Sequence, residues 1–229
     1  MRNLALVWVL AACLLGCGGR EAKDKVAAAV ASDTVAVLPD TATIAPDTDT
    51  TLTDTRDGKV YKKVTIGKQV WMAENLDYAA KGSKCYDNKA ANCAKYGRLY
   101  DWNTAMKACP VGWHLPSDGE WTMLESAIGS STAGMKLRSK TGWNDYGKGT
   151  DEYGFSTLPG GNGNSDGNFN YAGYYGYGYW WSATEIDAYY AWYRYMNSYD
   201  EYVHSSNYYR KTYLLSVRCV LDDEKDRRK

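Results

Sequence analysis

Two loops carry oxygen-bearing side chains in a pattern typical of calcium sites. The candidate ligands are Asp145, Asp151, Asn162, Asn164 and Asp166. The last three alternate and are followed by a glycine, as in the first half of an EF-hand loop, but the glutamate that would complete such a loop is absent. Because Asn, Asp and Gly also form ordinary turns, the pattern leaves open a Ca²⁺ cofactor or two turns without metal.

Tyrosine supplies most of the aromatic side chains, with 21 Tyr against 9 Trp and 2 Phe. Fourteen of the 21 lie between residues 171 and 213, and one small core cannot hide them all, although we expect Trp181 and Trp192 to be buried. Exposed tyrosines offer rigid contact area at a low entropy cost, and their faces suit stacking on sugar rings. The predicted binding face consists of Tyr174, Tyr175, Tyr177, Tyr193, Tyr195 and Tyr202. The alternative is a tyrosine-rich structural surface without a ligand.

The first 16 residues have the layout of an export signal. Arg2 precedes an apolar run at residues 4–15. This run of about a dozen residues is too short to cross a bilayer, which takes about 20. Residues 14–17, Leu-Leu-Gly-Cys, resemble the bacterial lipobox, in which the chain is cut before a cysteine that becomes acylated. We therefore predict a signal peptide at 1–16 and lipidation at Cys17.

The lipid would attach the chain to a membrane, because several acyl chains together hold firmly. Gly18, rather than aspartate, follows the cysteine, and in Gram-negative sorting this resembles an outer-membrane destination. We therefore expect a lipid-anchored protein of the cell envelope, at the outer membrane. The alternatives are a plain secretion signal that contains a cysteine, or an uncleaved anchor.

Composition divides the rest of the chain into a tether, a domain and a tail. Residues 17–56 are rich in Thr, Asp and Ala and contain no aromatic side chain. Such a segment buries too little apolar surface to offset its ordering entropy, which predicts a disordered tether. Residues 57–221 read as one folded domain, and the charged residues 222–229 as a disordered tail.

Four cysteines lie in the predicted domain, namely Cys85, Cys93, Cys109 and Cys219. An even number of cysteines in an exported chain favours two disulfides, but spacing does not choose among the three pairings. A zinc site has little support, because the chain contains no CxxC motif and only two histidines.

The charge balance and the motifs exclude several function classes. Basic and acidic residues are equal at 27 each, so no basic excess neutralises phosphates, and we expect no nucleic-acid partner. No HExxH or phosphate-loop motif occurs. His114 stands at a predicted helix start, where a structural hydrogen bond is the ordinary role, and His204 stands in a predicted polar loop. We therefore expect no enzyme.

The first local patterns in the domain predict a hairpin and a short helix. Residues 60–66 alternate in polarity, which predicts a strand. Gly67 and Lys68 suit a turn, and residues 69–72 are predicted to form the second strand of the hairpin. A helix is predicted at 102–108, because its apolar residues share one side and Pro110 stops it.

The second half predicts one helix, one long loop and a final strand. Ser117 and Glu120 form a capping-box pattern before an apolar stripe in residues 121–128. Residues 142–167 are rich in Gly, Asn and Asp, which is typical of a loop. Residues 214–221 alternate as a strand does.

Seven segments together resemble one family. They are residues 57–61, 69–76, 96–102, 109–117, 154–161, 180–185 and 216–220. By these segments, residues 57–221 resemble the Fibrobacter succinogenes major paralogous domain. That family is similar in turn to the C-type-lectin-like and formylglycine-generating-enzyme folds, through a helix ending in Cys, a His-Leu-Pro helix start and a last strand with a closing Cys.

The resemblance implies an α+β, C-type-lectin-like mixed fold, with two short helices packed on small antiparallel sheets, long irregular loops and two disulfides. It implies the pairs Cys109–Cys219 and Cys85–Cys93. Cys219 is the only cysteine near the chain end, so the reactive cysteine pair of formylglycine-generating enzymes has no counterpart. The Glu-Pro-Asn motif of calcium-dependent lectins is also absent, although Trp-Asn-Asp occurs at 143–145.

These observations predict a membrane-anchored envelope lipoprotein that displays a non-catalytic binding domain. The expected ligand is a polysaccharide or a surface protein. The alternative is a structural or assembly component of the cell envelope without a small ligand.

Overall fold

The computed structural model describes residues 50–173 and 176–223. Cys17, Tyr174 and Tyr175 therefore lie outside the described residues, as do the predicted signal peptide and most of the predicted tether. The described chain combines helices with antiparallel sheets and two disulfides, which confirms an α+β fold. None of its helices is both long and apolar enough to cross a membrane.

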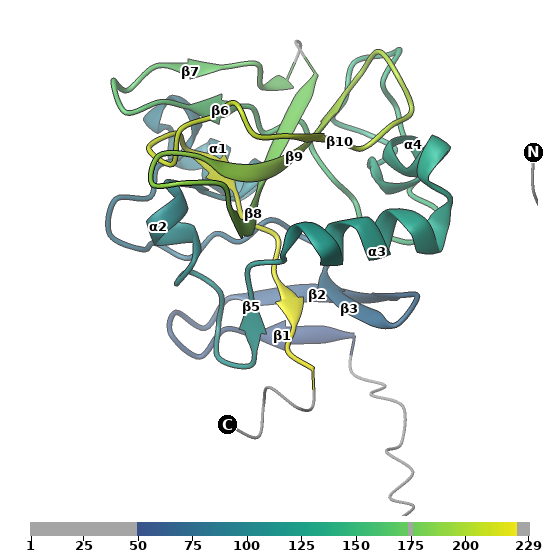
Figure 1. Cartoon of the computed structure of the whole chain (residues 1–229), viewed down its shortest axis with the longest axis horizontal. Helices are drawn as coiled ribbons and strands as arrows, with labels where there is room; N and C mark the ends of the chain where they lie inside the picture. The colour runs from purple at the N-terminus through teal and green to yellow at the C-terminus, as the bar shows by residue number, and fades with distance from the viewer. Residues whose placement is uncertain (1–49, 174–175, 224–229) are drawn as a thin grey trace, which may run out of the picture. The chain divides into compact units, whose positions relative to one another are not determined.

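The first sheet occupies the lower half of Figure 1. Its strand order is β1-β2-β3-β12-β5, and all neighbours are antiparallel. The bounds are Thr51–Thr53 for β1, Val60–Ile66 for β2, Gln69–Met72 for β3, Val220–Leu221 for β12 and Trp113–His114 for β5. Strands β2 and β3 form the predicted hairpin, with Ile66 opposite Gln69.

Strand β1 corrects the predicted boundary between tether and domain at residue 56. Leu52 pairs with Tyr61 of β2, so the folded part begins before residue 57. Asp54 is fully buried and accepts hydrogen bonds from the guanidinium of Arg56 at 2.8 and 2.6 Å. The prediction was wrong because residues 51–53, Thr-Leu-Thr, carry little apolar area of their own and gain order from pairing with β2.

The second sheet lies above the first in Figure 1. Its order is β10-β9-β8-β11-β4, with β8 and β11 parallel and the other pairs antiparallel. The bounds are His204–Ser206 for β10, Ala191–Asn197 for β9, Tyr177–Glu185 for β8, Leu215–Ser216 for β11 and Leu99–Tyr100 for β4. A two-stranded ribbon joins β6 (Asn162–Gly163) to β7 (Phe169–Asn170).

The predicted final strand at 214–221 is divided between the two sheets. β11 belongs to the second sheet and β12 to the first, and residues 217–219 cross from one to the other. This crossing, drawn in yellow in Figure 1, carries Val217 and Cys219, both fully buried. One continuous strand cannot pair in both sheets, so the chain leaves the ladder between them.

The helices are short, apart from one. Their bounds are Ala90–Tyr96 for α1, Trp102–Ala105 for α2, Asp118–Ile128 for α3 and Ala133–Leu137 for α4, with 3-10 turns at Tyr86–Asn88 and Ser130–Thr132. α2 ends three residues before the predicted end at 108. The predicted capping box at the start of α3 is confirmed: Ser117 accepts from the Glu120 amide, and the Glu120 carboxylate accepts from the Ser117 amide at 2.7 Å.

Helix α3 lies between the two sheets in Figure 1 and contacts β2, β8 and β9. Its buried stripe consists of Trp121, Leu124 and Ile128, as predicted. The Trp121 ring lies 4.9 Å from that of Trp71 in β3, and both are fully buried. One core cluster therefore joins α3 to the first sheet.

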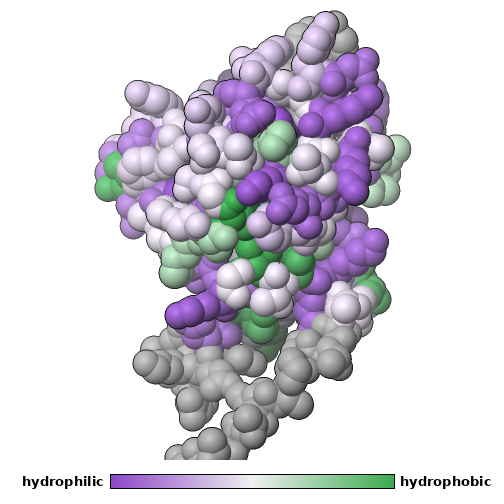
Figure 2. All heavy atoms as spheres, turned by 90° about the vertical axis from the view of Figure 1, so that its right-hand side faces the viewer, coloured by the Kyte–Doolittle hydropathy of each residue, from purple (hydrophilic) through white to green (hydrophobic). Residues whose placement is uncertain are grey.

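Polar and apolar residues are interspersed on the side that bears α4. Figure 2 shows this side, where the strongly apolar atoms gather in a narrow strip between the upper and lower parts. No broad apolar patch appears on this face, so it lacks the surface that a large apolar protein interface needs.

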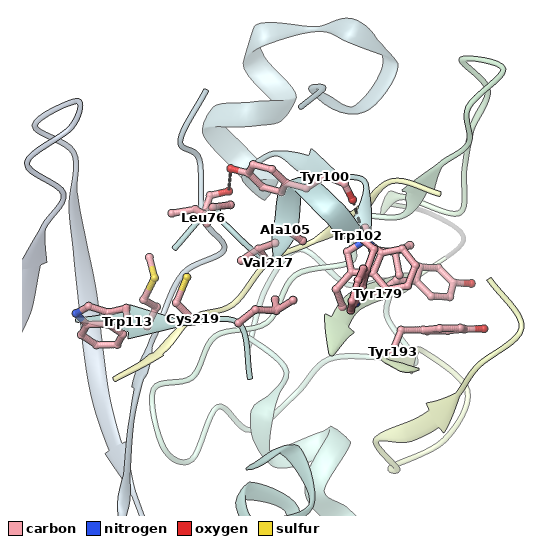
Figure 3. Close-up of a cluster of buried hydrophobic side chains, with 14 of the residues drawn as sticks. Leu76, Tyr100, Trp102, Ala105, Trp113, Tyr179, Tyr193, Val217 and Cys219 are labelled. Atoms are coloured by element: carbon pink, nitrogen blue, oxygen red, sulfur yellow. Dashed lines mark hydrogen bonds between the residues drawn. The ribbon is translucent and has the colours of Figure 1, made fainter. Parts of the chain in front are cut away.

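A second core cluster lies between α2, the crossing segment and one face of β8 and β9. Figure 3 shows Leu76, Tyr100, Val217 and Cys219 in it. Trp181 is fully buried as predicted and donates from Nε1 to the Tyr100 carbonyl at 2.8 Å. The prediction that Trp192 is buried was wrong, because the residue is only partly buried.

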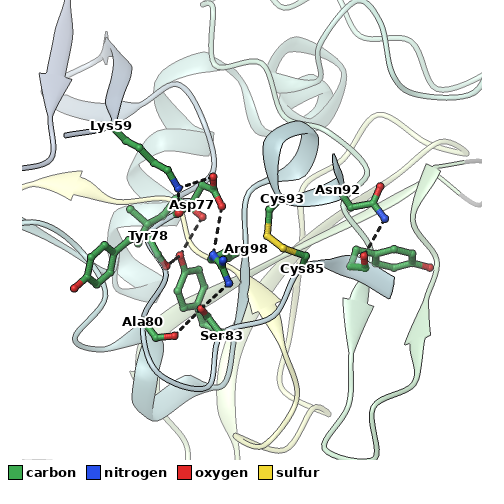
Figure 4. Close-up of a disulfide and its surroundings, with 12 residues drawn as sticks. Lys59, Asp77, Tyr78, Ala80, Ser83, Cys85, Asn92, Cys93 and Arg98 are labelled. Atoms are coloured by element: carbon green, nitrogen blue, oxygen red, sulfur yellow. Dashed lines mark hydrogen bonds and ion pairs between the residues drawn. A yellow bond between two sulfur atoms is a disulfide. The ribbon is translucent and has the colours of Figure 1, made fainter. Parts of the chain in front are cut away.

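Both disulfide pairs implied by the family resemblance are confirmed. Cys109 and Cys219 are 110 residues apart in sequence and 5.9 Å apart at Cα, and they join the end of the α2 segment to the crossing segment. Cys85 and Cys93 close a small loop of separation 8 beside α1, shown in Figure 4.

His114 links the start of α3 to the beginning of the predicted tail. Nδ1 lies 2.6 Å from Asp222 Oδ1 and Nε2 lies 2.7 Å from Glu120 Oε1. Because both ring nitrogens face carboxylates, both carry protons. The prediction of a disordered tail from residue 222 is wrong at Asp222 itself, because its amide also donates to the Gly112 carbonyl at 2.9 Å.

These contacts predict a pH-dependent stability. The hydrogen bond to Glu120, followed by the one to Asp222, raises the pKa of His114 to about 9 from 6.5. Since the folded pKa lies above the unfolded one, the stabilisation is complete below pH 6.5 and is lost as the pH rises through 9. Urea midpoints at pH 6 and 9.5 should show this loss, and His114→Gln should reduce it. An equal loss in the variant would assign the pH dependence to other groups.

Candidate functional site: a tyrosine platform on the second sheet

The tyrosines gather on one face of β8 and β9 because side chains alternate along a strand. Tyr179 stands opposite Tyr195, and Trp181 stands opposite Tyr193, so these four side chains share a face. Directly opposed aromatic residues stabilise such a pair of strands. The other face carries Trp180, which is buried against the core.

One end of this tyrosine face is covered by the segment after β10. The ring of Tyr209 stacks on that of Tyr193 at 4.8 Å, and Tyr213 stacks on Tyr209 at 4.5 Å. Asn162 fixes this cover by donating to the Tyr209 hydroxyl at 2.9 Å. Burial is the main cause that raises the pKa of Tyr193 to about 12. The prediction that Tyr193 belongs to an exposed binding face is therefore wrong, because only 4% of it is exposed.

The other end of the face is open, and we call it the tyrosine platform. It consists of Tyr171, Tyr177, Tyr195, Tyr199, Tyr202 and His204. The Tyr177 ring lies 5.6 Å from Tyr171 and 6.1 Å from Tyr199. The Tyr195 ring stacks on His204 at 4.5 Å, and Tyr202 meets the edge of that histidine at 6.0 Å. Tyr199 and Tyr202 are 68% and 51% exposed, so the platform offers ring faces to the solvent.

A turn after β9 holds Tyr199 and Tyr202 in place. The Asn197 side-chain oxygen accepts from the Tyr199 amide at 2.6 Å, and the Asp200 carboxylate accepts from the Tyr202 amide at 3.0 Å. From below, Nη1 of the buried Arg138 donates to the Asp200 carbonyl at 2.7 Å. Asx turns of this kind fix a loop without regular secondary structure.

Asp200 also adds charge and hydrogen-bonding capacity to the platform. Its carboxylate lies 2.9 Å from His204 Nε2 and accepts from Asn197 Nδ2 at 2.9 Å. Burial by itself would raise the pKa of Asp200, but the hydrogen bonds from Asn197, Tyr202 and His204 together hold it below its ordinary value. A partly exposed carboxylate beside open ring faces suits a ligand with both apolar faces and hydroxyl groups.

Sequence reasoning found part of this site. Of the predicted face, the structure brings Tyr177, Tyr195 and Tyr202 together, and His204, placed by sequence in a loop, belongs to β10. Tyr171, Tyr199, Asn197 and Asp200 were missed. The Asn-x-x-Asp spacing at 197–200 was the available signal, because both side chains cap the turn.

The two predicted calcium loops have protein partners instead. Asp145 pairs with Lys148 at 2.9 Å, and Asp151 accepts from the hydroxyl of Ser156 at 2.6 Å. Among the described residues, no group of three or more His, Cys, Asp or Glu side chains is placed to hold a metal ion.

The second loop is a turn built around Asn164. Its side-chain oxygen accepts from the amides of Asp166 and Asn168 at 3.1 and 3.0 Å. Asn162 is buried, and its side-chain amide donates to the Tyr209 hydroxyl. These contacts explain the alternating Asn and Asp residues of this loop without a metal ion. Calcium binding stays a prediction.

Comparison with known protein families identifies the family of this chain. The model of the Fibrobacter succinogenes major domain matches residues 64–221. The chain belongs to this family. The match begins within β2 and ends with β12, so in this member of the Fibrobacter succinogenes major domain family it includes the second sheet, α3, the platform and the first sheet without β1 and the start of β2. No curated protein and no solved structure matches significantly.

Proposed function

We propose that this family member is a lipid-anchored protein of the cell envelope, attached through Cys17, whose domain binds a polysaccharide without catalysis. The observation that supports it is the tyrosine platform, with exposed ring faces beside the carboxylate of Asp200. Aromatic rings stack on the apolar faces of sugars, and the carboxylate accepts hydrogen bonds from their hydroxyls.

The position of the platform within the domain fits display away from an anchor. In Figure 1, β1, where the described chain begins, lies at the lower end, and β8 to β10 lie at the upper end. A ligand on the platform would therefore not meet the strand that leads towards the N-terminus.

A polysaccharide fits the surface better than a protein does. The platform mixes phenol hydroxyls with charge, and the side in Figure 2 shows no broad apolar patch. We also propose that the fold is C-type-lectin-like, on the support of Cys109 after α2 and of the closing Cys219 near the last strand.

The proposal predicts retention on a polysaccharide that depends on the platform. The mature chain carrying Cys17→Ser would be incubated with insoluble cellulose, chitin, xylan and pectin. Tyr177→Ala and Tyr195→Ala should each weaken retention about tenfold, which is the usual effect of removing an aromatic anchor. The control is Tyr189→Ala, because Tyr189 is 66% exposed and lies in the turn at the other end of β8 and β9.

Equal retention of all three variants would contradict a role for the platform. Retention of none of the proteins, including the parent chain, would favour the alternative of a structural component of the envelope. Unchanged melting temperatures would show that the variants fold.

A further inference from the structure

A cleft of about 590 Å³ lies apart from the platform, between β2, the segment after β3, the end of α1 and the loops at 139–158. Arg218 and Asn75 form its floor, and Lys95 and Lys140 are among its lining residues. The segments by which the chain resembles its family, among them 69–76, 96–102 and 154–161, supply much of its wall. The platform tyrosines take no part in it.

Arg218 is buried without a carboxylate partner. Nε and Nη2 donate to the Asn75 side-chain oxygen at 3.1 and 2.8 Å, and Nη1 donates to the carbonyls of Phe155 and Met72 at 2.7 and 3.3 Å. A guanidinium has five N–H groups, so one on Nη2 remains unused. All these acceptors are neutral. Burial lowers the pKa of Arg218 to about 9, although the charges of Glu74 and Asp151 act in the opposite direction.

The wall of the cleft is held in unusual backbone conformations. Asp151 and Ser156 are non-glycine residues with φ of 47° and 55°. The Ser156 amide and hydroxyl both donate to the Asp151 carboxylate, at 2.8 and 2.6 Å, which fixes this wall. On the opposite side, Gly97 has φ of 75°, and a Cβ there would meet the Asn75 side chain at 2.7 Å. Such conformations persist where the surrounding structure holds them, and they concentrate at functional sites.

Cations outnumber acids among the residues that line the cleft. Lys59 is engaged with Asp77 at 2.7 Å, as Figure 4 shows, and Asp151 is engaged with Ser156. Among the described residues, neither Lys95 nor Lys140 forms an ion pair. The lining holds four cations, Lys59, Lys95, Lys140 and Arg218, against three acids, Glu74, Asp77 and Asp151, so one positive charge is in excess.

We propose that this cleft binds a sugar carboxylate, as in a uronic acid, with Arg218 as its counter-ion at the floor and Lys95 and Lys140 near the opening. The hydroxyls of Thr141 and Ser156 lie in the lining, where they meet the ring hydroxyls. A peptide carboxylate fits less well, because β2 is paired on both edges, with β1 and β3, and offers no strand edge to a peptide.

Trp180 supplies a reporter next to the floor, since its indole N–H donates to the Asn75 side-chain oxygen at 2.8 Å. Trigalacturonate would be titrated into the ¹⁵N-labelled mature chain carrying Cys17→Ser. We expect the Trp180 indole resonance to shift, and that of Trp102, which donates to the Ser182 carbonyl, to stay in place. The methyl ester of trigalacturonate, which lacks the charge, should cause no shift.

Lys140→Gln and Lys95→Gln should each weaken binding about threefold, the size expected for an exposed charge pair, and Lys107→Gln, outside the cleft, should not. Tyr177→Ala should leave this binding unchanged, so failure here is distinguishable from failure of the platform. The proposal is overturned if trigalacturonate leaves Trp180 unshifted, if the methyl ester binds equally, or if a peptide with a free carboxyl terminus shifts Trp180 and trigalacturonate does not.

Discussion

Replacing Cys109 and Cys219 by serine is expected to lower the free energy of unfolding by about 5 kcal/mol, the chain-entropy value for a loop of this length. The two residues are 110 apart in sequence, so the bridge constrains most of the domain in the unfolded state. Cys219 lies on the segment that crosses between the sheets, and it is fully buried. A loss of this size approaches the whole stability of an ordinary domain, about 5–15 kcal/mol.

The second disulfide is the matched control. Cys85 and Cys93 enclose a separation of only 8, for which the same relation gives about 2.5 kcal/mol. Urea unfolding of both double-serine variants, at one pH and temperature, measures the two losses. A larger loss from the short loop than from the long one would contradict the chain-entropy account and would point to strain or packing at Cys85.

Asn75→Ala is expected to cost about 3–5 kcal/mol, because it leaves a buried charge without its acceptor. The Asn75 oxygen accepts from Arg218 and from Trp180, and its nitrogen donates to the Tyr96 carbonyl at 2.8 Å. Arg218 is only 1% exposed, so solvent compensates little for the lost acceptor. Differential scanning calorimetry and urea unfolding measure the loss.

Asn103→Ala is the control, since Asn103 is exposed in α2 and surface substitutions change stability by about 0.5 kcal/mol or less. Removing both partners, with Asn75→Leu and Arg218→Met, should cost less than the sum of the single changes. A cost below about 1 kcal/mol for Asn75→Ala would show that Arg218 finds another acceptor.

Elements with a strong local signal were predicted from the sequence. The β2–β3 hairpin follows from alternation around Gly67 and Lys68, and α3 follows from its capping box and apolar stripe. These signals act between residues close in sequence, so they need no knowledge of the tertiary fold. The disulfide pairing came from the family resemblance, because spacing left three choices open.

The errors arose where distant segments decide the structure. β1 is ordered by pairing with β2. The predicted strand at 214–221 is divided because β11 pairs in the second sheet and β12 pairs in the first. Tyr193 is buried because Tyr209 stacks on it from 16 residues further along the chain. The abundance of tyrosine at 171–213 predicted a common face that includes Tyr177 and Tyr195, but it could not show which end of that face a later segment covers.

The most direct test of the tyrosine platform observes its rings during binding. The mature chain carrying Cys17→Ser, with ¹³C-labelled tyrosine, would be titrated with an oligosaccharide from the polysaccharide that retains it. Our account predicts that the ring resonances of Tyr177, Tyr195, Tyr199 and Tyr202 shift, and that those of the buried Tyr100 stay in place. Binding that leaves all four platform resonances unchanged would contradict the account and would place the ligand elsewhere on the domain.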